Sequence, residues 1–171
     1  MHRKEYYLRK RAEYTPDKLR LIIVAESPPA SGKYFYDTDG RKSEPLFSAL
    51  MSSVLNFDPS DKNAGLTEFM NRGCILFDAT YEPVDKGLTP KRREEVILRD
   101  YPKLRKDLLD LTPNKEVPLL LIKANVCRLL DGRLCADGFK TVNAGVVVPF
   151  PSSGQQKKFK IAIAPLIKSL G

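Results

Sequence analysis

Two short apolar segments that run into proline-containing polar loops constrain the fold of this chain most. The first covers residues 21–25 and continues as residues 26–29, and the second covers residues 146–148 and continues as residues 149–155. Apolar runs of this length that end at proline are typical of buried strands. Because the carboxyl ends of parallel strands meet at one edge of an open sheet, the two loops are expected to share one crevice. A carboxylate in the first loop and hydroxyl and amide groups in the second predict a site there.

Strand-like and helix-like segments alternate along the chain, which predicts an α/β fold with right-handed crossovers. Strands are expected at residues 21–25, 73–78, 118–123 and 145–148, and helices at residues 3–13, 45–55, 66–71, 91–111, 125–130 and 159–169. The helix at residues 91–111 is expected to be interrupted or to restart around Pro102, and the last helix to bend or break near Pro165. The expected architecture is a three-layer α/β/α arrangement with a central, mostly parallel sheet of about four strands. At 171 residues the chain is expected to be a single domain, 1–171, with residues 1–19 as a basic N-terminal arm.

The formal net charge of +8 favours a polyanionic partner, of which nucleic acid is the most common. Basic residues cluster at residues 3–20, 91–93 and 157–160, and the last cluster directly follows the second loop. The alternative is that the protein is basic and soluble and that its charge indicates no polyanionic partner. No apolar run approaches the roughly 18 residues of a membrane helix, and the first residues lack the apolar stretch of a secretory signal. We therefore expect a cytoplasmic monomer with no membrane partner.

Cysteine and histidine are too few for the usual metal sites. Cys74, Cys127 and Cys135 are the three cysteines, and His2 is the one histidine. This set predicts no metal site and no Ser-His-Asp or Cys-His hydrolase.

Glu26 is the leading candidate for chemistry in the first loop. A carboxylate held at the end of a buried strand and next to prolines can orient or deprotonate a water molecule. The alternative is a solvated or salt-bridged glutamate. The loop that begins here is roughly 20 residues long, and loops of that length inside compact domains are usually functional.

In their order along the chain, these segments resemble the motifs of the uracil-DNA glycosylase superfamily. Residues 25–29 (AESPP) are similar to a first motif in which a strand is followed by a Gly-Glu-Ala-Pro-Gly type loop. Residues 150–155 (FPSSGQ) are similar to its second motif, His-Pro-Ser followed by small and polar residues. Residues 75–79 (ILFDA) stand where the superfamily has a strand ending in asparagine. The resemblance covers residues 21–168.

The resemblance implies a base that is flipped out of the DNA and held in the crevice. It implies that Glu26 and Ser152 are catalytic, with Glu26 positioning the water. It also implies an aromatic platform for the base, for which Phe47 is the leading match. The other residues expected to contact the base are Pro28, Phe35 or Tyr36, and Asp78. The alternative for Phe47 is a purely structural role in the core.

The second loop and the segment after it are expected to hold the DNA backbone. Ser152 and Ser153 would bind a phosphate through hydroxyl and backbone N–H groups. One of the glutamines would fill the gap in the base stack, and the lysines would contact flanking phosphates. These DNA-binding residues are Ser153, Gln155, Gln156, Lys157 and Lys158. A plain surface loop is the alternative for the glutamines.

Two residues depart from the superfamily pattern. Phe150 stands in place of the histidine that supports the departing base anion, and an apolar ring cannot donate that hydrogen bond. Asp78 stands in place of asparagine, and an ionised carboxylate only accepts hydrogen bonds. It would repel a uracil oxygen and accept from a cytosine amino group, which favours a modified or cytosine-type pyrimidine. The alternatives are that Asp78 points away or is protonated by burial.

These observations together predict a monofunctional DNA glycosylase that acts on a uracil-like or modified pyrimidine and needs no cofactor. Through its binding to DNA, the protein is expected to associate with the nucleoid. Three scattered cysteines cannot supply the four-cysteine iron–sulfur cluster found in the similar branch. Because no lysine amine stands in a matched catalytic position, hydrolysis without a Schiff base is expected. One alternative is a weakly active or inactive module that recognises DNA or damaged bases. Another is an enzyme acting on small nucleosides or nucleotides.

Overall fold

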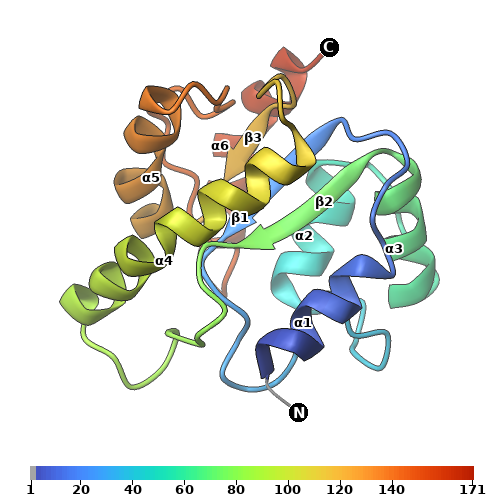
Figure 1. Ribbon diagram of the computed structural model, residues 1–171. Helices are drawn as coiled ribbons and strands as arrows, with labels where there is room; N and C mark the ends of the chain where they lie inside the picture. The colour runs from blue at the N-terminus through green and yellow to red at the C-terminus, as the bar shows by residue number, and fades with distance from the viewer. Residues whose placement is uncertain (1–2) are drawn as a thin grey trace.

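A sheet of three parallel strands forms the centre of the computed structural model, which describes residues 3–171 (Figure 1). The strands are β1 (Leu21–Ala25), β2 (Cys74–Asp78) and β3 (Leu119–Leu121), in the order β2-β1-β3. Ala25 pairs with Asp78 at the carboxyl end of the sheet. Every strand residue is buried, as is usual for a parallel sheet covered on both faces. The predicted α/β class and parallel sheet are confirmed.

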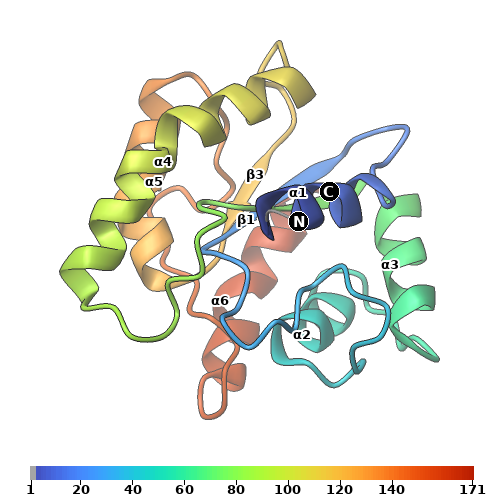
Figure 2. The same ribbon diagram turned by 60° about the horizontal axis from the view of Figure 1, so that its bottom comes forward.

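Helices pack on both faces of this sheet, so that the arrangement has roughly three layers. Figure 2 shows α4 on one face, with α2 and α6 on the opposite face. Within residues 3–171 the helices are α1 (Arg3–Ala12), α2 (Pro45–Ser53), α3 (Lys62–Asn71), α4 (Pro90–Leu111), α5 (Ala124–Ala136) and α6 (Gln156–Ser169). The predicted interruption at Pro102 is wrong, because α4 continues through that proline, and α6 likewise continues through Pro165 without a break. The helices α3 and α5 are longer than the sequence predicted.

Local sequence explains where several helices begin. The Thr89 hydroxyl accepts a hydrogen bond from the backbone N–H of Arg92 at the start of α4, and Asp61 accepts from Ala64 at the start of α3. Proline stands at the first position of both α2 and α4, where its missing N–H costs nothing. The first of these prolines, Pro45, was predicted to open its helix.

The predicted fourth strand at residues 145–148 is wrong. The Asn143 side chain bonds both backbone groups of Leu121, accepting from its N–H (2.8 Å) and donating to its carbonyl (3.0 Å). The chain then turns through positive φ at Ala144 (46°) and Gly145 (88°). A side-chain amide thus occupies the edge of β3 where backbone pairing was expected, and the sheet has three strands.

The basic N-terminal segment is packed against the domain as α1; residues 1–2 of the predicted arm, including His2, lie outside the described part. Tyr7 and Tyr14 are buried in the core. The guanidinium of Arg11 lies over the Phe77 ring of β2, 3.7 Å from its centroid. This helix therefore contributes aromatic contacts to the core as well as charge to the surface.

Candidate functional site

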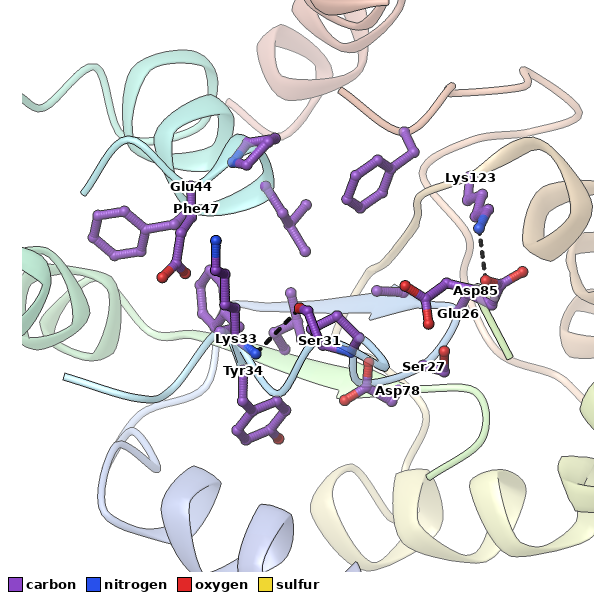
Figure 3. A pocket seen from close by; sticks show the side chains of 17 residues that line it. Glu26, Ser27, Ser31, Lys33, Tyr34, Glu44, Phe47, Asp78, Asp85 and Lys123 are labelled. Carbon is purple, nitrogen blue, oxygen red and sulfur yellow. Dashed lines mark hydrogen bonds and ion pairs between the residues drawn. The ribbon is translucent and has the colours of Figure 1, made fainter. Parts of the chain in front are cut away.

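A cavity of about 240 Å³ opens at the carboxyl end of the sheet, where the sequence predicted a crevice. Its walls come from the ends of β1 and β2, the loop after β1, the first turn of α2, and three residues from later in the chain, Asp85, Lys123 and Phe150. Figure 3 shows Glu26 and Asp78 at the ends of neighbouring strands, with Phe47 across the cavity. With Phe35, which also lines the cavity, four of the predicted site residues are therefore brought together.

Glu26 lies in an ion-paired cluster on one wall of this cavity. Its side chain is buried, and both carboxylate oxygens accept from Nη2 of Arg93, at 2.7 and 3.0 Å. Lys123 Nζ donates to Oε1 at 2.6 Å, and the Asn125 amide donates to Oε2. Burial alone would raise the pKa of Glu26, but the hydrogen bonds from Arg93, Lys123 and Asn125 outweigh it and lower that pKa.

The salt-bridged alternative for Glu26 thus describes the structure. A carboxylate with a lowered pKa is a weak proton acceptor. It remains ionised at neutral pH and its donors fix its orientation. Such a group is suited to orient a water molecule and to stabilise positive charge that develops nearby, more than to remove a proton completely.

Lys123 has an unusual backbone for a lysine. Its φ is 88° and its ψ is 137°, outside the regions that residues with a Cβ normally adopt. The backbone N–H donates to the carbonyl of Val148 (2.8 Å), and the carbonyl accepts from the N–H of Cys127 (3.0 Å). These contacts hold the residue between β3 and α5, with its ammonium on Glu26 and 6.0 Å from the centre of the Phe150 ring.

The donors to Glu26 were not found from the sequence. Lys123 and Asn125 directly follow the apolar run at residues 118–122. The rule that pointed to Glu26 and Asp78, polar residues at the carboxyl end of a strand, applies equally to them. A lysine amine therefore lies against the candidate catalytic carboxylate, a contact that the sequence did not predict.

Asp78 forms part of the cavity wall at the end of β2. It is 3% exposed, and its Oδ2 has no hydrogen-bond partner within residues 3–171. Burial raises the pKa of Asp78 to about 7, although the nearby Arg11 acts in the opposite direction. The side chain therefore does not point away from the site, and burial does favour its protonated form, as one alternative proposed.

Aromatic rings form the wall opposite Glu26. Phe47 and Phe35 both line the cavity, with ring centres 5.9 Å apart, and Tyr34 lies beside them. Phe47 is also fully buried, so it belongs to the core and to the cavity wall at once. Tyr36 does not reach the cavity, because its hydroxyl accepts from the Leu76 N–H at the edge of β2.

Two predicted parts of the site lie outside the cavity. Pro28 does not line it, although the adjacent Pro29 does. The serines, glutamines and lysines of residues 152–158 lie on the surface at the start of α6, most of them exposed. Phe150 alone connects that loop to the cavity. The structure therefore separates the predicted backbone-binding residues from the predicted pocket.

Comparisons with known proteins were made at the level of sequence families, curated proteins and solved structures. None of the three found a match to this chain. Within residues 3–171, no group of three or more histidine, cysteine, aspartate or glutamate side chains is arranged to hold a metal ion. None of the described helices is both long and apolar enough to cross a membrane.

Proposed function

We propose that this protein is a DNA glycosylase that hydrolyses the N-glycosidic bond of a flipped-out uracil-like or modified pyrimidine, acting as a monomer without a cofactor. The observation that carries the proposal is the pairing, in one small cavity, of an oriented carboxylate, Glu26, with an unpartnered carboxyl group, Asp78. Pockets for drug-sized ligands measure about 300–1,000 Å³. A cavity of about 240 Å³ suits a smaller group, such as a single base.

Each wall of the cavity has a role in this proposal. The base stacks against the rings of Phe47 and Phe35 and presents its polar edge to Asp78. Glu26 orients the attacking water and stabilises positive charge on the sugar as the base leaves. Phe150 cannot stabilise the departing anion by a hydrogen bond, but the Lys123 ammonium beside it brings positive charge to that side of the cavity.

The protonation state of Asp78 determines which base its carboxyl group can hydrogen-bond. A protonated carboxyl group can donate to a carbonyl oxygen and accept from a ring N–H, as an amide does. An ionised carboxylate can only accept, which favours an amino group such as that of cytosine. With a pKa of about 7, both forms are populated near neutral pH, so the substrate class includes uracil-like and cytosine-type bases.

The proposed DNA contacts lie outside the cavity. Ser152 and Ser153 would bind a phosphate beside the flipped nucleotide. Gln155 or Gln156 would fill the gap that the flipped base leaves in the stack. Lys157 and Lys158 would contact the flanking phosphates of the DNA backbone. The net charge of +8 supports this assignment.

The resemblance of the two loops to the superfamily motifs supports the proposal, and so does the course of residues 140–148. The Leu119 N–H donates to the Lys140 carbonyl (2.8 Å) and the Val142 N–H to the Leu119 carbonyl (2.7 Å). Residues 140–142 thus follow the free edge of β3 until Asn143 interrupts the pairing, and the chain then passes Lys123 and brings Phe150 of the second loop to the cavity.

Base release from labelled oligonucleotides tests the proposal. Single- and double-stranded DNA would carry uracil, hypoxanthine, 5-hydroxymethylcytosine or its glucosylated form. We expect release from at least one substrate, with loss in Glu26→Gln and with Asp78→Asn shifting the preference toward uracil at pH 8. Wild-type protein that releases no base from any of them would contradict the proposal.

The ion pairing of Glu26 favours a second candidate, a recognition module for damaged DNA. Arg93 and Lys123 already occupy both carboxylate oxygens, which leaves little room for a water molecule in this arrangement. Salt-sensitive binding to the modified oligonucleotides without base release would support the module. Binding of free nucleosides without DNA binding would instead indicate a small-molecule enzyme.

A further inference from the structure

We propose that Lys123 captures the C1′ aldehyde of an abasic deoxyribose as an imine, a covalent activity in addition to base release. The proposal rests on the proposed function for the identity of its substrate, DNA that has lost a base. It is carried by the position of the Lys123 amine, which lines the cavity and lies 2.6 Å from the carboxylate that would act on the same sugar.

Charge balance argues against a role for Lys123 as a mere counter-ion. Glu26 carries one negative charge, and Arg93 alone already contacts both of its oxygens. The Asn125 amide adds a further donor. Lys123 therefore brings a second positive charge to a carboxylate that is already neutralised. The arrangement needs an explanation beyond the burial of Glu26.

The backbone of Lys123 supports a positional role. A φ of 88° is costly for any residue with a Cβ, by about 1–3 kcal/mol, and such strain is concentrated at functional sites. The bonds to Val148 and Cys127 hold this conformation on both sides of the residue. The side chain is nonetheless 26% exposed, and it lies at the cavity rather than within the core, so a sugar can reach its amine.

The chemistry needs no group that the site lacks. After base loss, the open form of the sugar has an aldehyde at C1′. As Nζ forms a bond to C1′, one proton of the Lys123 ammonium passes by way of the Glu26 carboxylate to the aldehyde oxygen, so that Glu26 only relays the proton and stays ionised. The aldehyde oxygen takes up that proton and one from the nitrogen and leaves as water. The net change converts an ammonium ion and an aldehyde into a protonated imine and one water molecule.

Arg93 holds the Glu26 carboxylate in position during this proton transfer. Because its guanidinium stays charged throughout, Glu26 remains oriented while the proton moves. The same carboxylate can then serve both steps, first orienting water for base release and afterwards relaying the lysine proton to the aldehyde oxygen.

Borohydride trapping tests the proposal without any dependence on base release. The full-length protein is incubated with DNA that carries a preformed abasic site, and borohydride reduces the imine to a stable amine. We expect a covalent protein–DNA adduct, located on Lys123 by mass spectrometry of the digested protein. No adduct from the wild-type protein, or an adduct located only on other residues, would overturn the proposal.

Two variants sharpen the result. Lys123→Arg keeps the positive charge beside Glu26, but a guanidinium forms no imine. The yield of the adduct should therefore fall at least tenfold, while the melting temperature stays close to that of the wild type. Lys33→Met removes the other lysine that lines the cavity and should retain the adduct. An adduct that persists at the wild-type level in Lys123→Arg would overturn the assignment.

The two proposals fail independently. An adduct on preformed abasic DNA without base release from any modified oligonucleotide would leave Lys123 as the reactive amine of a protein that acts on abasic sites, and would refute the glycosylase. Base release without an adduct would support the glycosylase and refute the imine.

Discussion

The ammonium of Lys62 is fully buried and donates one hydrogen bond to the Glu44 carboxylate and another to the Tyr34 carbonyl, both at 2.9 Å. Lys62 begins α3, whereas Tyr34 and Glu44 belong to the loop between β1 and α2. The same ammonium lies 5.6 Å from the centre of the Phe47 ring. One side chain thus connects the long loop to α3 and supports the aromatic wall of the cavity.

Removing this connection should destabilise the protein. In Lys62→Met, Glu44 loses its cation and the Tyr34 carbonyl loses a donor, so we expect a loss of about 3 kcal/mol in the free energy of unfolding. Urea denaturation measures it. Lys42→Met is the matched control, because the half-exposed Lys42 ammonium pairs with the exposed Asp58 at 4.0 Å and donates to the Pro59 carbonyl at 3.1 Å, and its loss should cost about 1 kcal/mol. Equal losses in the two variants would contradict the structural role of Lys62.

Gly65 permits the close approach of α3 to the aromatic wall. A Cβ added there would lie 2.4 Å from Cζ of Phe47 and 3.0 Å from Sδ of Met51. Gly65→Ala should therefore destabilise the protein by about 1–3 kcal/mol and displace Phe47, although alanine normally favours a helix. Gly132→Ala, in α5, meets nothing within 4 Å and should stabilise by about 0.5–1 kcal/mol. Thermal denaturation of both variants should show opposite signs.

The sequence predicted the elements whose signals are local. The apolar runs at β1 and β2 and the caps of α3 and α4 lie within a few residues of the structure they specify. The run of valines at residues 146–148 carried the same signal and was misleading. Val146 and Val147 are exposed (41% and 37%), because the Asn143 amide takes the edge of β3 in place of the backbone. A side chain that acts as a strand partner leaves no periodic pattern.

The same distinction applies to the candidate site. Glu26, Asp78 and Phe47 could be predicted because each stands at a strand end or on a helix face that the sequence reveals. Lys123 lies 97 residues from Glu26 in the sequence but follows the apolar run of β3, so the strand-end rule could have found it. Arg93 lies 67 residues away within α4, and only the packing of that helix beside the sheet brings it to Glu26. Nothing near Glu26 in the sequence indicates how many cations will surround it.

The positive φ of Lys123 predicts an unusual order of stability between two variants. Lys123→Gly and Lys123→Ala both remove the ammonium from Glu26, but only glycine adopts a φ of 88° without steric cost. The glycine variant should therefore be more stable than the alanine variant by about 1–2 kcal/mol. At Lys103, which is exposed in α4, the order should reverse by about 1 kcal/mol. Urea denaturation of the four variants gives both differences, and the same order at both positions would contradict the strained backbone.

Asp78 should make stability depend on pH in the direction opposite to an ordinary ion-paired carboxylate. Burial raises the pKa of Asp78 to about 7 from an ordinary value of 3.8, so between these values the folded state binds more protons than the unfolded state. The contribution of Asp78 to stability must then fall as pH rises from about 4 to 7, and level off above that range. In total the fall amounts to at most about 4 kcal/mol.

The variant Asp78→Asn has no proton to lose, so the difference in unfolding free energy between it and the wild type isolates this contribution. We expect Asp78→Asn to gain on the wild type steadily between pH 4 and 7 and to keep that advantage at pH 8. Asp58→Asn, at an exposed carboxylate, provides the control and should show a nearly constant difference. A constant difference for Asp78→Asn as well would mean that Asp78 does not titrate in this range. The pH-dependent choice between uracil-like and cytosine-type bases would then lose its physical basis.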